Sequence, residues 1–390
     1  MVDFLAEAKT LFEYTRALRR DFHRHPELGF QEIRTAGIVA RELNNLGLEV
    51  TTGVAETGVV ALLEGDQPGP VALLRFDMDA LPITEQTGAE YASQNPGVMH
   101  ACGHDGHTAI GLTVARLLHK HRQEIAGTVK LVFQPAEEGA GGAERMVAEG
   151  VLANPRPDFT LALHLWNEKP LGWLGISPGA IMAAADIFKI RIEGKGGHGG
   201  LPHLAIDPMV AAAQMITALQ TIVSRNISPL LSAVVSVTSV HGGDAFNVIP
   251  SEVKLLGTIR TSEPDVREQV LARFHPLVLG IAEAMNCQAE VEAESLTPAV
   301  VNDARVAVRV REAAGRVLPE STLDPNFHTM VSEDMAFMMQ GTPGCYFFVG
   351  SANSEKGLDA LHHHPRFDFD ELVLPRAVAL MASAAVELLG

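Results

Sequence analysis

The feature that most constrains the fold is a change in the order of predicted strands and helices near residue 180. Before it, apolar runs predict three buried strands, at residues 71–76, 128–133 and 159–163, and helical patterns lie between them. Strands that alternate with helices favour an α/β layer with a mostly parallel sheet. The first part of the chain is therefore predicted to form such a sheet, covered by helices.

The middle of the chain follows a different order. It has four alternating strands and two helices, predicted at residues 185–192, 207–224, 232–240, 252–260, 264–285 and 289–294. The order β-α-β-β-α-β is that of a ferredoxin-like sandwich. We therefore predict a ferredoxin-like domain, residues 181–295, inserted into an α/β domain that is left in two parts, residues 1–180 and 296–390.

Local signals also predict where some helices begin and end. Apolar positions at helical spacing favour one amphipathic helix over residues 3–22. Asp105 is expected to cap a helix that runs to about residue 121. Asp207 is expected to cap a second helix, because Pro208 suits the first helical position.

Composition limits the possible partners and compartments. The chain has 30 Lys and Arg against 47 Asp and Glu, a net charge of −17, which repels phosphate backbones and anionic lipid surfaces. Neither nucleic acid nor a membrane is therefore an expected partner. No run of about 18 or more apolar residues is present, and the first residues are acidic where an export signal needs positive charge.

Cysteine usage points the same way. The chain has three cysteines, Cys102, Cys287 and Cys345, which is too few and too sparse for a disulfide framework. Such usage is typical of a reducing compartment. A cytoplasmic location is therefore expected, with any special cysteine present for its chemistry.

Histidines are unusually clustered. Several of the 16 histidines stand beside Asp, Glu or Cys at the predicted ends of strands, where open α/β sheets bind ligands. Cys102 and His104 are two residues apart in a glycine-flanked turn, so both can face one metal ion. Two alternatives stay open: Cys102 is a nucleophile with His104 or His107 as its base, or the turn is an ordinary helix start.

Two adjacent acids follow an apolar strand. Neighbouring carboxylates directed into a cleft are unfavourable unless a cation neutralises one. The natural division makes Glu138 a ligand and Glu137 a proton shuttle, whereas a solvated acidic turn is the alternative. His164 ends another strand, although a lone histidine there is more often a satisfied core residue. The three consecutive histidines from His362 form a fourth candidate segment.

With these segments in place, the sequence resembles the metal-dependent amidohydrolases of the M20 peptidase family, in the branch with hippurate hydrolases and auxin-conjugate hydrolases. The matching stretches follow one another along nearly the whole chain, at residues 23–28, 77–82, 100–107, 134–139, 164–166, 196–203 and 363–370. The resemblance implies a catalytic domain interrupted by a lid domain, two metal ions between them, and a lid that helps to build a homodimer or homotetramer.

The resemblance also assigns roles position by position. The family's metal ligands fall on Cys102, His104, Glu138, His164 and His363, and its general base falls on Glu137. His363 matches because the ligand stands two residues before a proline, and His362 is the fallback.

The chain departs from the wider family at Asp77-Met78-Asp79, where the family has a His-x-Asp ligand motif. In this branch the cysteine takes the place of the missing histidine. A thiolate favours borderline ions such as Zn²⁺, and oxygen-rich sites admit Mn²⁺, so Zn, Mn, Ni and Co all stay open. Asp77 and Asp79 are expected to orient the ligands.

The predicted lid offers four candidate substrate contacts: His198, His203, Asn247 and Arg260. In similar enzymes a lid histidine reaches the partner subunit's active site and stabilises the oxyanion, for which His203 is the first choice and His198 the second. An arginine in the place of Arg260 grips the substrate's carboxylate bidentately. The alternative for each is an ordinary turn or strand residue.

The resemblance thus predicts metal-dependent hydrolysis of the amide bond of N-acyl amino acids, which gives a carboxylic acid and an amino acid. A dipeptidase and an N-acetyl-diamino acid deacetylase are the alternatives within the family. A cysteine hydrolase that uses Cys102 and a non-catalytic binding protein are the alternatives from other classes.

Overall fold

The computed structural model describes residues 2–390, and the chain divides into two compact units. Unit 1 comprises Met1–Gly179, Val301–His328 and Asp334–Gly390, and unit 2 comprises Ala180–Val300 and Thr329–Glu333. The segment Thr329–Glu333, in which the chain returns to unit 2, was not predicted from the sequence. It is held by two backbone hydrogen bonds, from Thr329 N to Ile181 O (2.9 Å) and from Ala183 N to Val331 O (3.0 Å).

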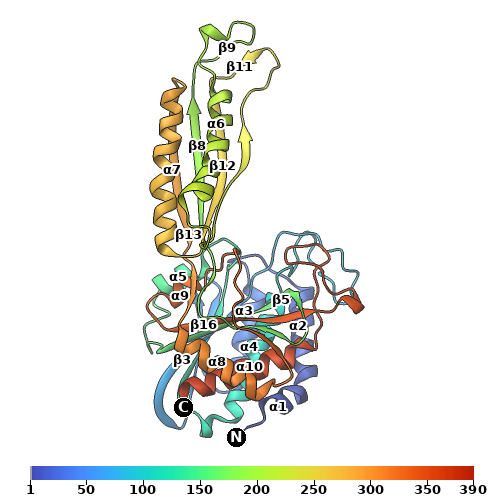
Figure 1. The fold of residues 1–390 in the computed structure, drawn as a ribbon. Coiled ribbons are helices and arrows are strands. Elements are labelled where there is room, and N and C mark those ends of the chain that lie inside the picture. The colour runs from blue at the N-terminus through green and yellow to red at the C-terminus, as the bar shows by residue number, and fades with distance from the viewer. Residues whose placement is uncertain (1) are drawn as a thin grey trace. The chain divides into compact units, whose positions relative to one another are not determined.

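Unit 1 is built on one eight-stranded sheet (Figure 1). In spatial order its strands are β1 (Glu49–Val54), β2 (Gly58–Glu64), β4 (Ala126–Gln134), β3 (Gln67–Asp77), β5 (Phe159–Pro170), β16 (Gly344–Ala352), β6 (Trp173–Gly175) and β15 (Thr322–Asp324). The four central strands, β4, β3, β5 and β16, run parallel to one another. Strands β1 and β2 pair antiparallel with their neighbours, and β6 pairs antiparallel with β16 and parallel with β15. The predicted mostly parallel α/β sheet is confirmed.

Helices complete unit 1. They are α1 (Phe4–Thr10), α2 (Phe12–Arg24), α3 (Ile33–Asn45), α4 (His104–Lys120), α5 (Gly142–Ala148), α8 (Ala304–Val317), α9 (Ala336–Met339) and α10 (Val373–Leu389). Helices α4 and α10 pack on the central strands, and both are buried along most of their length. Short helical turns lie at Arg122–Glu124 and Ser354–Lys356 in unit 1, and at Pro202–Leu204 and Ile222–Asn226 in unit 2.

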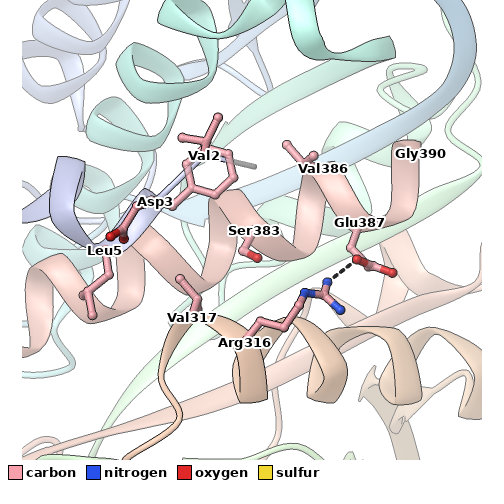
Figure 2. A pocket seen from close by; sticks show the side chains of 10 residues that line it. Val2, Asp3, Leu5, Arg316, Val317, Ser383, Val386, Glu387 and Gly390 are labelled. Atoms are coloured by element: carbon pink, nitrogen blue, oxygen red, sulfur yellow. Dashed lines mark hydrogen bonds and ion pairs between the residues drawn. The ribbon is translucent and has the colours of Figure 1, made fainter.

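A surface hollow is lined by the first residues of the described chain and by the C-terminal parts of α8 and α10. Figure 2 shows Val2 and Leu5 on one side and the ion pair between Arg316 and Glu387 on the other. None of the residues lining the hollow is a predicted site residue. This hollow therefore plays no part in the candidate site described below.

Unit 2 contains a four-stranded antiparallel sheet with two helices. The strands, in spatial order, are β10 (Ala233–His241), β12 (Glu252–Thr261), β8 (Ala184–Glu193) and β13 (Gln288–Thr297). The helices are α6 (Pro208–Thr221) and α7 (Pro264–Ala284), and a small ribbon pairs β9 (Gly197–His198) with β11 (Val248–Ile249). Strands β7 (Gly179–Met182) and β14 (Val300–Asn302) lie where the chain crosses between the units. The chain order of the sheet, 2-3-1-4, is the ferredoxin-like arrangement that the sequence predicted.

Two local predictions were wrong. The single helix over residues 3–22 is broken at Leu11, because α1 packs against α10 while α2 packs against α4. Asp105 does not cap α4; the helix begins after Gly103, whose φ of 91° suits a glycine. The Asp207 cap is confirmed, since its carboxylate accepts a hydrogen bond from Met209 N (2.9 Å).

Two expectations from composition can be compared with the structure. All three cysteines are free thiols. Within residues 2–390, no helix has the length and apolar character that a membrane span requires.

Candidate metal centre and substrate contacts

Unit 1 brings all the predicted metal ligands into one cluster near the carboxyl ends of its central strands. Potential ligand atoms lie within 4.8 Å of one another in three overlapping groups: Cys102 with His104 and His164, Cys102 with Glu138 and His363, and His104 with Glu137 and Glu138. The two acids follow β4, and Cys102 and His104 stand at the start of α4. The prediction that His164 ends its strand was wrong, because β5 continues to Pro170 and His164 lies in its middle. The cluster therefore depends on the crossover connections of the sheet.

His104 has one ring nitrogen fixed by a hydrogen bond, whereas the other makes none and lies 3.8 Å from Asp77 Oδ2. Its Nδ1 donates to the Asp79 backbone oxygen (3.0 Å) and lies 3.2 Å from Asp79 Oδ1. Its Nε2 is buried and makes no hydrogen bond within residues 2–390. Burial lowers the pKa of His104, but the carboxylates of Asp77 and Asp79 outweigh burial and raise it to about 10. A buried unpartnered nitrogen among negative groups is suited to a cation.

The two ring nitrogens of His164 also differ in their contacts. Its Nδ1 donates to the Leu165 backbone oxygen (2.7 Å), and its Nε2 lies 3.4 Å from Cys102 Sγ. Burial, together with the neighbouring histidines, holds the pKa of His164 well below its usual range. A neutral imidazole whose Nδ1 carries the proton leaves Nε2 available as a ligand.

The structure distinguishes between the two candidate histidines near the C-terminus. His363 Nε2 lies 3.3 Å from Glu138 Oε1, and this contact raises the pKa of His363. His362 Nε2 instead donates to the Leu165 backbone oxygen (2.9 Å), so that nitrogen carries a proton. The geometry favours His363, the first choice, over His362.

His107 is close to the cluster but its ring is saturated. Its Nδ1 donates to Asp77 Oδ1 (2.6 Å), and its Nε2 accepts from the Leu165 backbone N–H (3.0 Å). It is therefore not suited to be a ligand, although its atoms lie within 4.8 Å of Asp77 and His104. This orienting position was not predicted from the sequence. Its spacing from His104, i to i+3 on one helix, was the signal that could have found it.

A buried arginine keeps Asp77 charged. Arg75 Nη1 donates to Asp77 Oδ2 (2.6 Å), and its Nε donates to Gln134 Oε1 (2.7 Å). Burial raises the pKa of Asp77, but the charges of His104, His107 and Arg75 outweigh it and hold the pKa well below its usual range. These contacts, with those of Asp79, are what an orienting role for the two aspartates requires.

The environment of Cys102 argues against the nucleophile alternative. Burial and the carboxylates of Glu138 and Glu137 raise the pKa of the Cys102 thiol, whereas a nucleophilic cysteine needs a lowered pKa. His107, one of the two candidate bases, has both ring nitrogens in hydrogen bonds. A thiolate at this position needs a cation beside it.

A second buried charge cluster, also missed by the sequence analysis, holds α2 against the start of α4. Asp105 Oδ2 accepts from Arg19 Nε (2.8 Å) and from His23 Nδ1 (2.8 Å). His23 Nε2 also lies 3.2 Å from Glu85 Oε1. Burial lowers the pKa of His23, but its contacts with Asp105 and Glu85 raise it to about 9.

Unit 2 places its predicted substrate contacts in two separate regions. His198 lies on β9, and Asn247 lies beside it, because Gly199 N donates to the Asn247 backbone oxygen (2.8 Å). His203 lies in the short turn Pro202–Leu204. The side chains of His198, His203 and Asn247 are exposed. Arg260 lies at the other end of β12, about 30 Å away along the strand. Within unit 2, the structure therefore does not bring Arg260 together with His198.

Arg260 has no carboxylate partner within residues 2–390. Its guanidinium donates to the Thr258 hydroxyl and to the Ile259 backbone oxygen (3.2 Å), and burial lowers its pKa. The nearby Asp186 carboxylate is instead bound by Arg267, with Nη2 at 2.6 Å from Oδ1. Within the described residues, Arg260 is therefore not part of an ion pair in unit 2.

The fold and the cluster define a class: an α/β domain with a candidate metal centre of sulfur, nitrogen and oxygen ligands, interrupted by a ferredoxin-like unit. Residues 73–387 match Peptidase family M20/M25/M40. The chain belongs to this family, so the predicted family and fold class are confirmed.

Individual relatives agree with the predicted class of reaction. The chain is 41% identical to IAA-amino acid hydrolase ILR1-like 5 of Arabidopsis thaliana, over 99% of this chain and 89% of the relative. It is 40% identical to N-acetyl-L-cysteine deacetylase of Bacillus subtilis, over 97% of this chain and 89% of the relative. The crystal structure of the Bacillus subtilis YXEP protein, described as a dinuclear metal-binding peptidase of the M20 family, matches with a TM-score of 0.86 and 36% identity, covering 98% of this chain and 99% of that one.

Proposed function

We propose that this protein is a metal-dependent amidohydrolase that cleaves N-acyl amino acids into a carboxylic acid and an amino acid. The observation that carries the proposal is the cluster in which one thiol, three imidazoles and two carboxylates converge, with His104 and His164 buried and His363 exposed. The names of two relatives, a deacetylase and an amino acid conjugate hydrolase, describe the same class of reaction.

Five residues would hold two divalent cations: Cys102, His104, Glu138, His164 and His363. The Nε2 of His104, which makes no hydrogen bond within residues 2–390, and the oriented Nε2 of His164 support this assignment. The mixture of sulfur, nitrogen and oxygen donors is compatible with Zn, Mn, Ni or Co. When bound, such ions polarise an amide carbonyl and lower the pKa of a bound water towards about 7.

Glu137 would be the general base. Its carboxylate lies within 4.8 Å of a carboxylate oxygen of Glu138 and of a ring nitrogen of His104, so it stands beside the proposed ligands. It would take a proton from the attacking water and pass it to the nitrogen of the leaving amine. No covalent intermediate on Cys102 is needed.

Arg260 would bind the α-carboxylate of the amino acid, because a partly buried guanidinium without an acidic partner suits a carboxylate. His203, or else His198, would stabilise the oxyanion, and Asn247 would contact the substrate. Because these residues lie at opposite ends of β12, one small substrate cannot reach both sets within one copy of unit 2.

We therefore infer that a second copy of the chain contributes its His203 and Asn247. Strand β10 is an edge strand with exposed Val234 and Val240, which supports a homodimer or homotetramer formed through unit 2. The acidic surface and the three free cysteines support a cytoplasmic location.

Complementation tests the shared site. Glu137→Gln and His203→Ala variants are each expected to be inactive alone. If they are denatured and refolded together in equal amounts, mixed dimers should contain one intact site, which restores about a quarter of the wild-type activity. Two copies of one variant, treated in the same way, are the control. If His203→Ala is active alone, whereas His198→Ala is inactive alone and regains activity when refolded with Glu137→Gln, His198 is the oxyanion residue. If neither inactive histidine variant regains activity in the mixture, the partner contribution is contradicted.

A hydrolysis screen tests the function itself. N-acetyl, N-benzoyl and N-indoleacetyl amino acids are incubated with enzyme loaded with Zn²⁺, Mn²⁺, Co²⁺ or Ni²⁺, and Glu137→Gln serves as the blank. Release of a free amino acid by wild type alone is the expected result. Cleavage of dipeptides or N-acetyl-diamino acids without cleavage of N-acyl amino acids would establish one of the alternatives instead.

A further inference from the structure

The turn that carries Glu137 and Glu138 is conformationally demanding. Ala136 has a φ of 53°, which is unfavourable for a residue with a Cβ, and Gly139 and Gly141 have φ values of 80° and 76°. A Cβ on Gly142 would lie 1.7 Å from the Pro135 oxygen, so the chain leaves the turn with no space for a side chain. Such a turn persists only if its surroundings hold it.

Three buried carboxylates hold this turn through its backbone N–H groups. Ala136 N donates to Glu32 Oε1, Glu138 N donates to Asp79 Oδ2, and Ala143 N donates to Asp334 Oδ2, each at 2.9 Å. Glu32, Asp79 and Asp334 are exposed by 2% or less. Asp79 also orients His104, and Asp334 binds Arg75, so only Glu32 is free of the metal cluster.

Glu32 reaches the turn from a distant part of the sequence. It lies immediately before α3, and its second oxygen accepts from the Thr57 hydroxyl (2.6 Å). Behind the turn, a Cβ on Gly29 would lie 3.0 Å from Ala136 Cβ, so Ala136 is confined on that side as well. A fully buried carboxylate is unfavourable unless hydrogen bonds satisfy it, and the backbone of Ala136 supplies one of them.

We propose that Glu32 is a positioning residue for the reaction: by fixing Ala136 in its left-handed conformation, it sets the direction in which the next residue, Glu137, projects. This inference rests on the proposed function, since it assumes that Glu137 is the base. A misplacement of about 1 Å in a reacting group can cost about a hundredfold in rate. The effect of Glu32 is therefore expected in kcat.

Glu27 provides a matched control. It lies five residues before Glu32, and its carboxylate accepts two backbone N–H groups, from Arg34 (2.9 Å) and Thr35 (2.8 Å). Its side chain makes no hydrogen bond to the turn at 136–143 within residues 2–390. Glu27→Ala removes these two hydrogen bonds at the start of α3, so it should lower the free energy of unfolding. It should not move Glu137.

The experiment compares Glu32→Ala, Glu32→Gln and Glu27→Ala. Glu32→Ala is expected to lower kcat about ten- to a hundredfold, with KM and metal content within about twofold of wild type. Glu32→Gln should recover most of kcat, because its amide oxygen still accepts from Ala136 and its amide nitrogen can donate to Thr57. Hydrogen exchange in metal-free protein gives a second measurement: peptides covering residues 134–143 should exchange faster in Glu32→Ala and unchanged in Glu27→Ala.

The outcomes separate this inference from the proposed function. If Glu137→Gln is inactive but Glu32→Ala behaves like Glu27→Ala in kcat and exchange, the role of Glu32 is overturned and the function stands. If Glu137→Gln stays active, the base assignment and the role of Glu32 fall together. Should Glu32→Ala not fold, Glu32→Asp decides, because its shorter carboxylate cannot reach both Thr57 and Ala136; wild-type kcat in that variant overturns the inference.

Discussion

The proposed catalytic residues of unit 1 and the proposed substrate contacts of unit 2 are held in opposite ways. In unit 1, His104 and His164 are buried, and each has one ring nitrogen fixed by a backbone oxygen. In unit 2, His198, His203 and Asn247 are exposed. A buried polar group cannot move without losing its hydrogen bonds, whereas an exposed one exchanges protein contacts for water at little cost.

This difference indicates a division of tasks. The unit 1 cluster is arranged before any substrate arrives, which suits groups that must hold cations and move a proton. The exposed residues of unit 2 need a substrate or a second chain to fix them. Changes in unit 1 should therefore abolish chemistry or metal binding, and changes in unit 2 should mainly alter which substrates are accepted.

Glu137→Gln tests the unit 1 side of this division and should have the largest effect. The amide is nearly isosteric but cannot accept the proton, so kcat is expected to fall by about a thousandfold or more while metal content is unchanged. Metal analysis and steady-state kinetics check this. A variant that keeps more than about a tenth of the wild-type kcat would contradict the role of Glu137 as base.

Cys102→Ser tests whether the same cluster binds metal through sulfur. A neutral hydroxyl replaces a thiolate, so metal affinity should fall by about tenfold or more, and activity should return only at high metal concentration. Equilibrium dialysis measures the affinity. Cys345→Ala is the control, because Cys345 is buried in β16 outside the cluster. Full metal occupancy in an inactive Cys102→Ser variant would instead support the nucleophile alternative.

The same contrast explains what the sequence could predict. Buried strands appear as apolar runs, and because strand ends meet at one edge of a sheet, residues such as Cys102, Glu138 and His164 could be grouped without a structure. The pairing of Arg19 with Asp105 could not be predicted in this way. The two residues are 86 positions apart, and a charge in a helical segment shows nothing of a distant partner.

The arginines of unit 2 show where local reasoning stops. Arg260 and Arg267 are seven residues apart, and either could have paired with Asp186. In the structure Asp186 pairs with Arg267. Arg260 lies on one face of β12, whereas the buried residues Ile259 and Thr261 of that strand lie on the other. The alternation of apolar and polar residues predicted the strand. Which of the two arginines pairs with Asp186 depends on the packing of the sheet, which the sequence does not show.

Arg260→Ala therefore tests the unit 2 side of the comparison. Loss of a charged hydrogen bond should lower kcat/KM for N-acyl amino acids by a factor that corresponds to about 1.5–3 kcal/mol of lost binding free energy. The decrease should be much smaller for the matching α-amides. The comparison of both substrates in wild type and variant is the measurement. Arg267→Ala is the control: it removes the partner of Asp186, so it should lower stability and affect both substrates alike. An equal loss on both substrates in Arg260→Ala would remove Arg260 from the substrate site.

The smallest expected effect is a pH dependence of stability that arises from the buried cluster at the start of α4. His23 has its pKa raised from 6.5 to about 9, because its contacts with Asp105 and Glu85 outweigh burial. A group whose pKa is raised by folding stabilises the folded state fully below its unfolded pKa, and this contribution is lost as the pH rises through the folded pKa. The loss should therefore fall between about pH 6.5 and 9, and it amounts to at most about 3 kcal/mol.

Urea unfolding at several pH values, for wild type and His23→Gln, measures this loss of stability. The difference between the two proteins removes the contribution of groups that they share. Because a glutamine does not titrate, the variant's deficit should shrink towards pH 9. A deficit that is constant with pH would mean that folding does not raise the pKa of His23.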